Sequence, residues 1–111
     1  IKCLLEAEIE YCREEDLMRE TLRQLTFMLY SIGKVEDIPI LFEAKMDTSF
    51  DAGCSLDIEL IFGKNKEEIK SYFRVNKNKK YDIVGCIEEY EKYNFQTPDE
   101  FTKGMERYYK R

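Results

Sequence analysis

The sequence predicts an α+β fold: a three-stranded sheet of β-α-β-β order with a long helix on one face, followed by three short C-terminal helices. Three observations lead to this prediction. Apolar and polar residues alternate in three segments, as they do in strands with one buried face. One segment between them has apolar residues at helical spacing, and the last third of the chain carries three helix-start signals.

The first predicted strand covers residues 3–12, and its centre reads LEAEIEY (5–11). Every second residue is apolar, and the residues between them are the glutamates Glu6, Glu8 and Glu10. A helix would distribute these glutamates around its cylinder, whereas a strand places all three on one side. The alternation therefore predicts a strand, although Glu and Ala are poor strand formers.

The long helix is predicted for residues 14–33. The helix dipole would stabilise the acidic residues at its start, and Gly33 suits its end. Phe27 and Tyr30 lie off the apolar stripe, so we expect either the C-terminal half or a partner to cover them. The stripe itself consists of Met18, Leu22, Leu25, Leu29 and Ile32.

A hairpin is predicted next, with strands at 37–47 and 55–63 and a turn at 48–53. Both strands alternate apolar and polar residues, and the turn TSFDAG is rich in turn formers. Pro39 fits a strand entry or an edge position.

Three helices are predicted after the hairpin, starting at Asn65, Asp82 and Thr97. Asn65 and Thr97 are each followed by Glu at the third helical position, which is typical of a capping box, and Pro98 suits a first helical position. A basic linker, 75–80, separates the first two helices. We expect it to be a solvated loop, and direct nucleic-acid binding is not expected of so few positive charges in an acidic protein.

The composition is that of a globular chain, and we expect a single domain over residues 1–111. The chain is 43% hydrophobic and 37% charged, has no histidine, and contains no apolar run of the roughly 20 residues that a membrane helix needs. The absence of histidine excludes triad chemistry and His-based acid–base catalysis. The four cysteines lack metal-ligand spacing, so we expect no cofactor or metal, reduced buried thiols and a cytoplasmic location.

Charge is distributed unevenly along the chain. Residues 1–62 carry 6 basic and 14 acidic side chains, a balance of −8, whereas residues 63–111 carry 12 basic and 9 acidic ones, a balance of +3. This asymmetry favours head-to-tail contacts between copies, or a basic partner for the acidic part.

The predicted sheet would gather seven carboxylates on its outer face. Like charges on adjacent strands repel one another, so such a face calls for an explanation. Three remain open: a solvated face that prevents aggregation, a docking face for a basic partner, and a metal or catalytic site. The carboxylates are those of Glu6, Glu8, Glu10, Glu43, Asp47, Asp57 and Glu59, with Lys45 among them.

The catalytic explanation depends on Glu43, Lys45, Asp57 and Glu59. Carboxylates and a lysine on adjacent strands could hold Mg²⁺ and polarise a phosphodiester. Glu43-Ala44-Lys45 resembles one fragment of restriction-endonuclease-like sites, but the acidic residue expected on the preceding strand is missing.

Six of the eight tyrosines follow residue 70, and tyrosine is enriched at protein interfaces. Packing of these tyrosines on the outer side of a small hydrophobic core would explain their positions equally. We expect Tyr108 and Tyr109 to contact another chain, which adds them to Glu6, Glu8, Glu10, Phe27 and Tyr30 as predicted partner-binding residues.

These patterns predict a small, non-enzymatic protein-binding module. An acidic chain of this kind suits an inhibitor of a nucleic-acid-handling protein, of the immunity, antitoxin or phage anti-defence type. Two alternatives remain: a metal-dependent phosphodiesterase, and an accessory or homo-oligomerisation domain of a longer protein, since the chain begins at Ile1.

Overall fold

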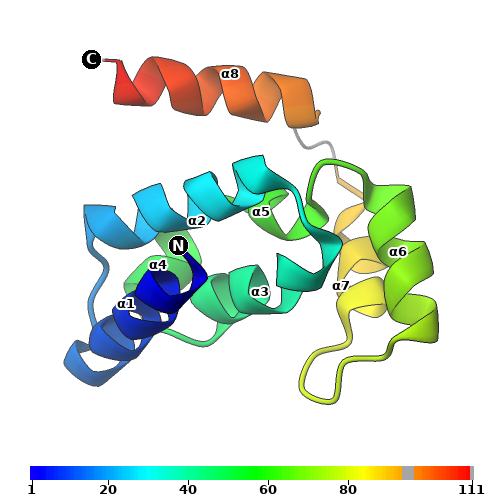
Figure 1. The fold of residues 1–111 in the computed structure, drawn as a ribbon, viewed down its shortest axis with the longest axis horizontal. Helices are drawn as coiled ribbons and strands as arrows, with labels where there is room; N and C mark the ends of the chain where they lie inside the picture. The colour runs from blue at the N-terminus through cyan, green and yellow to red at the C-terminus, as the bar shows by residue number, and fades with distance from the viewer. Residues whose placement is uncertain (94–96, 111) are drawn as a thin grey trace.

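The computed structural model describes residues 1–93 and 97–110, and every regular element in these ranges is helical (Figure 1). Eight α-helices and one 3₁₀ turn account for 74% of the described residues, which contain no strand. The predicted α+β fold with a three-stranded sheet is therefore wrong. Each of the three predicted strands is helical instead, for a different physical reason.

Helix α1 (Lys2–Glu15) replaces the first predicted strand. Its buried face consists of Leu5, Ile9 and Cys12, which recur at i, i+4 and i+7, together with Glu8. The alternating pattern of LEAEIEY contains this helical stripe as well as the strand period. Glu and Ala favour the helix, and their propensity decides between the two periods.

Helix α2 (Glu20–Ile32) is shorter than predicted at its start. Glu14 and Glu15 belong to the end of α1, which stops at Asp16 in a left-handed conformation with φ 49°. The predicted end is confirmed: Gly33 has φ 79°, and its N–H donates to the Leu29 carbonyl. Of the predicted stripe, Leu22 and Leu29 are buried, whereas Ile32 is exposed.

The second predicted strand is helix α3 (Ile38–Met46), which follows the 3₁₀ turn η1 (Val35–Asp37). Helices α1, α2, α4 and α5 all contact α3, so it lies at the centre of the fold. Its buried side chains cover more than half of its circumference at about 100° per residue: Ile38, Ile40, Leu41, Phe42 and Ala44. So wide a buried face leaves no narrow apolar stripe, and the helical period is therefore hard to read from the sequence.

The predicted turn and third strand form the short helices α4 (Phe50–Ser55) and α5 (Glu59–Phe62). Ser49 caps α4 by accepting a hydrogen bond from the Ala52 N–H at 3.1 Å. At the other end, the Lys45 ammonium donates to the Gly53 and Leu56 carbonyls, each at 2.7 Å. A cation at this position complements the negative end of a helix dipole.

The three predicted C-terminal helices are confirmed as α6 (Lys66–Val75), α7 (Ile83–Tyr90) and α8 (Pro98–Tyr109). Asn65, Asp82 and Thr97 each accept a backbone N–H as predicted, and Thr97 with Glu100 forms a full capping box. Helices α6 and α7 pack as a pair, and α8 lies across α2 at the edge of the molecule (Figure 1).

One hydrophobic cluster extends from Leu5 on α1 to Met105 on α8, so every helix contributes to the same core. The four cysteines are free thiols, but the prediction that all are buried is wrong because Cys3 and Cys54 are exposed. No helix in the described ranges combines the length and the apolar character needed to span a membrane.

Candidate protein-binding face

An apolar strip lies exposed on α1 and α2, where the two helices pack against each other. Each residue of an α-helix is rotated by about 100° from the one before it. On α1, Leu4 and Tyr11 therefore lie within one quadrant, about 100° round the axis from the middle of the buried face. Met28 and Ile32 follow one turn apart on α2, on the flank opposite Phe27. We call these four residues the apolar strip.

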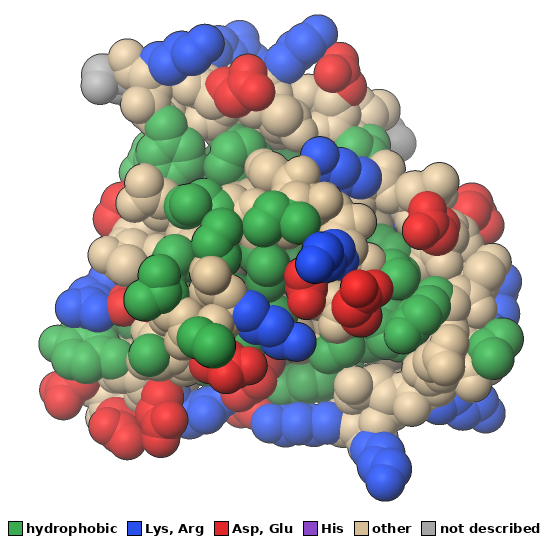
Figure 2. All heavy atoms as spheres, viewed as in Figure 1, with side chains coloured by type: hydrophobic (Ala, Val, Ile, Leu, Met, Phe, Trp, Pro, Cys, Tyr) green, Lys and Arg blue, Asp and Glu red, His purple; other side chains and the backbone are tan. Residues whose placement is uncertain are grey.

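The strip is well exposed for side chains of its kind: Leu4 is 63% exposed and Ile32 is 51% exposed. Tyr11 and Met28 are exposed to 43% and 41%. Figure 2 shows apolar side chains gathered on this face, over α1 and α2. Several exposed apolar side chains on one face of a small domain are typical of an interaction site.

Five exposed carboxylates lie on α1 and at its end; at about 100° per residue Glu14 and Glu15 lie nearest the strip, whereas Glu6 lies on the opposite flank of the helix. None of the five has an ion-pair partner among residues 1–93 and 97–110, whereas most basic side chains nearby are paired. Figure 2 shows acidic side chains gathered at the lower left, where α1 ends. We call this set the acidic rim: Glu6, Glu10, Glu14, Glu15 and Asp16.

Glu8 differs from the other two predicted glutamates because it faces inward and is only 6% exposed. The Arg19 Nε donates to its Oε2 at 2.7 Å, and the Arg19 Nη2 donates to its Oε1. The Cys12 thiol donates to the same Oε2 at 3.4 Å. The hydrogen bonds from Arg19 hold the pKa of Glu8 below its usual value, against the opposing effect of burial.

Arg19 also connects the buried carboxylate to the apolar strip. Its guanidinium lies over the Tyr11 ring, 4.0 Å from the centroid, in a cation–π contact. Burial and the nearby Glu8 raise the pKa of the Cys12 thiol, so this cysteine stays protonated. The structure therefore separates the predicted glutamates: Glu6 and Glu10 face solvent, and Glu8 positions Arg19.

The four predicted aromatic contacts lie together between α2 and α8. Phe101 of α8 packs edge-on against Tyr30 at 5.1 Å and against Phe27 at 6.0 Å between centroids. Tyr109 stacks near Phe27 at 6.0 Å, and the Tyr108 hydroxyl donates to Glu20 at 3.0 Å. Within this chain, α8 covers the flank of α2 that carries Phe27 and Tyr30. The sequence had left open whether the C-terminal half or a partner would cover these two side chains.

Three buried polar atoms without a hydrogen bond lie in or beside this contact, within the described ranges: Tyr30 Oη, Tyr109 Oη and Arg23 Nε. Burial raises the pKa of Tyr30 to about 12, opposed by the neighbouring Thr102 side chain. Burial also raises the pKa of Tyr109 to about 12. The contact thus combines good ring packing with poorly satisfied polar groups.

The proposed catalytic carboxylates have structural partners. Glu43 accepts a hydrogen bond from Arg13 at 2.7 Å, and Lys45 binds the two carbonyls that end α4. Burial lowers the pKa of Lys45, while Asp57 and Glu59 oppose that shift through their charge. No group of three or more His, Cys, Asp or Glu side chains in the described residues is arranged to hold a metal ion.

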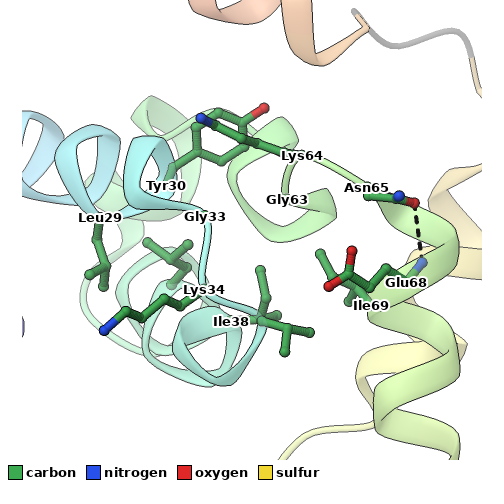
Figure 3. A pocket seen from close by; sticks show the side chains of 12 residues that line it. Leu29, Tyr30, Gly33, Lys34, Ile38, Gly63, Lys64, Asn65, Glu68 and Ile69 are labelled. Carbon is green, nitrogen blue, oxygen red and sulfur yellow. Dashed lines mark hydrogen bonds between the residues drawn. The ribbon is translucent and has the colours of Figure 1, made fainter.

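A small cavity of about 50 Å³ lies between the end of α2, the start of α3 and the α5–α6 connection (Figure 3). Ile38 and Ile69 project toward it, and Asn65 at its edge accepts the Glu68 N–H. A space of this size holds a few water molecules at most. It offers no room for a substrate or cofactor.

Sequence reasoning missed Leu4, Met28 and Ile32 as candidate binding residues. Leu4 precedes a buried leucine, and Ile32 was assigned to the core. Their exposure follows from how α1 and α2 pack together, which no local pattern encodes. Of the rim and the strip, only Glu6 and Glu10 were predicted as binding residues; Tyr11 was placed on the apolar side of the predicted strand. Comparison of the chain with protein-family models, curated proteins and solved structures finds no match.

Proposed function

We propose that this chain is a non-enzymatic protein-binding module whose α1–α2 face receives a basic segment of a partner protein. The observation that carries the proposal is the apolar strip with unpaired carboxylates along its border. Apolar contacts supply affinity in the centre of an interface, and charges at its rim supply orientation and association rate. Leu4, Tyr11 and Met28 provide the first, and Glu10 and Glu14 the second.

The partner class that we propose is a basic protein that handles nucleic acid, with this chain as its cytoplasmic inhibitor. Such proteins present positively charged grooves, and a helix lined with carboxylates can occupy a groove of that kind. Support comes from the charge balance of −8 in residues 1–62 and from the unpaired acids at the end of α1, of which Glu14 and Glu15 lie beside the apolar strip.

The test is site-specific photo-cross-linking from residue 28 in the full chain, in lysate of the native host. A benzophenone side chain replaces Met28 on the face, and Arg107 on α8 in a matched control, because both positions are exposed. The expected result is one discrete basic protein cross-linked from position 28 and not from position 107. Its yield should fall with salt, because charge at the rim is screened.

Two variants then distinguish specific binding at the α1–α2 face from nonspecific binding. Glu10→Lys with Glu14→Lys reverses the rim and should abolish the cross-link. The same change in sign on α8, Glu106→Lys, should leave it intact, because Glu106 is exposed and remote from the face. Equal cross-linking from positions 28 and 107, or none from either, would contradict the proposed function.

A further inference from the structure

The connection between α6 and α7 carries a surface that is complementary to the α1–α2 face. Lys77 and Lys79 are exposed and have no ion-pair partner in the described part of the chain. Val75, 83% exposed, stands next to them at the end of α6. An exposed apolar side chain among unpaired lysines mirrors the apolar strip with its acidic rim. We call residues 74–80 the basic loop.

The basic loop has a defined shape. The Asn78 side-chain oxygen accepts the N–H groups of Lys80 and Tyr81, at 2.9 and 2.8 Å. Lys80 pairs with Asp47 at the end of α3 at 2.8 Å, and the Tyr81 ring packs against Phe42 at 5.6 Å between centroids. These contacts use Lys80 to anchor the loop and leave Lys77 and Lys79 directed at solvent. A pre-shaped loop loses less conformational entropy on binding.

An open hollow of about 520 Å³ lies between the basic loop and the start of α7. Basic side chains and an apolar floor line it, contributed by Arg74, Lys77, Lys79, Phe73 and Val84. The end of α1 is by contrast a protruding helix terminus that carries Glu14 and Glu15. The charges of the two surfaces are therefore complementary, although Asp82 also lines the hollow.

The end of α1 lies at the lower left in Figure 1, and the α6–α7 connection lies at the bottom, right of centre. Asp47 at the end of α3 lies between the two regions: its carboxylate is 3.9 Å from Nη2 of Arg13 on α1 and 2.8 Å from Nζ of Lys80 in the basic loop. Lys77 and Lys79 have no ion-pair partner among the described residues, so they remain available to the acidic rim of a second copy.

We propose that the basic loop of a second copy docks on the α1–α2 face, so that copies associate head to tail. This inference rests on the proposed function, since it uses the same face and names a partner for it. Such a contact joins two different surfaces, so it leaves one face and one loop free and continues to open chains or closed rings. The nucleic-acid-handling partner would compete with the second copy for the face.

The test is sedimentation velocity of the full chain over a range of concentrations, with two charge-reversed variants. The face variant is Glu10→Lys with Glu14→Lys, and the loop variant is Lys77→Glu with Lys79→Glu. Each variant alone should need a concentration at least about tenfold higher than the parent chain to associate, because its two surfaces then repel. An equimolar mixture of the two should associate again, since each restores the opposite charge to the other.

The control variant is Arg107→Glu with Lys110→Glu on α8, which makes the same change in net charge as the loop variant, away from both surfaces. It should associate like the parent chain. Raising salt from about 50 to about 500 mM should weaken association of the parent and of the mixture alike.

A parent chain that stays monomeric at every concentration would overturn the inference, and so would association that neither variant weakens or that mixing does not restore. A monomeric chain that still cross-links a basic protein from position 28 would overturn the head-to-tail contact alone. A chain that self-associates but gives no such cross-link would contradict the proposed external partner and leave the contact between copies standing.

Discussion

Arg19 binds the buried carboxylate of Glu8 with two side-chain N–H groups, and this pair fixes the start of α2 against α1. The two partners are unequally placed: Glu8 is buried, whereas the Arg19 side chain is 44% exposed. After the pair is broken, Arg19 could be hydrated but Glu8 could not. This difference predicts different costs for losing either partner.

Replacing Arg19 should therefore destabilise the fold more than replacing Glu8. Glu8→Gln keeps the shape and removes the charge, and it should cost about 1–2 kcal/mol. Arg19→Met leaves an unpaired carboxylate in the core and should lower the urea midpoint further. Equal midpoints for the two variants would show that water reaches Glu8.

Acid should weaken the fold partly through Glu8. The pKa of Glu8 is lowered in the folded state relative to the ordinary value of 4.5, so the folded state stabilises its ionised form. This contribution is fully present above pH 4.5 and is lost as pH falls through the lower folded pKa. Urea midpoints measured from pH 7 downwards should fall less steeply in Glu8→Gln than in the parent. Glu6→Gln, at an exposed site, should reproduce the parent curve.

Removing the Tyr30 hydroxyl should stabilise the protein. This oxygen is buried and forms no hydrogen bond of acceptable geometry, so it loses hydration without compensation. Tyr30→Phe retains the ring contact with Phe101 and should raise stability by about 0.5–1 kcal/mol, measured by urea unfolding. A loss of stability would mean that the hydroxyl bonds the Thr102 side chain in solution.

Two glycines should respond in opposite directions to alanine. Gly63 has φ 64°, and a Cβ there would lie 2.1 Å from Cδ1 of Ile69 and 3.2 Å from Cδ1 of Ile38. Gly63→Ala should therefore cost at least about 2 kcal/mol. Gly104 lies inside α8 with nothing within 4 Å of its Cβ position, so Gly104→Ala should add about 0.5–1 kcal/mol. Thermal unfolding of both variants checks the pair.

Local signals predicted the C-terminal third well. Asn65, Asp82 and Thr97 cap their helices because a capping side chain acts on N–H groups only two or three residues away. Gly33 ends α2 for a similarly local reason, since only glycine adopts its left-handed backbone without cost. Such features depend on neighbours in sequence and can be read from it.

The three segments predicted as strands, 3–12, 37–47 and 55–63, were assigned wrongly because burial there is decided by the whole fold. Leu60, Ile61 and Phe62 are consecutive and all buried, which suits a strand as well as a short central helix. In LEAEIEY, Leu5 and Ile9 satisfy both periods. Ionic contacts between distant helices, such as Arg13 with Glu43, were equally invisible in the sequence.

The central position of α3 has a kinetic consequence. The side chains that bury α3 come from segments between Leu5 and Phe62. Helix α3 therefore gains its contacts only when these segments have come together. Amide protons of Leu41 and Phe42 should consequently exchange with solvent only through global opening, whereas amides of α8 can exchange through local detachment. Amides in the first half of the chain thus report on global unfolding, and those of the last helix report on smaller local openings.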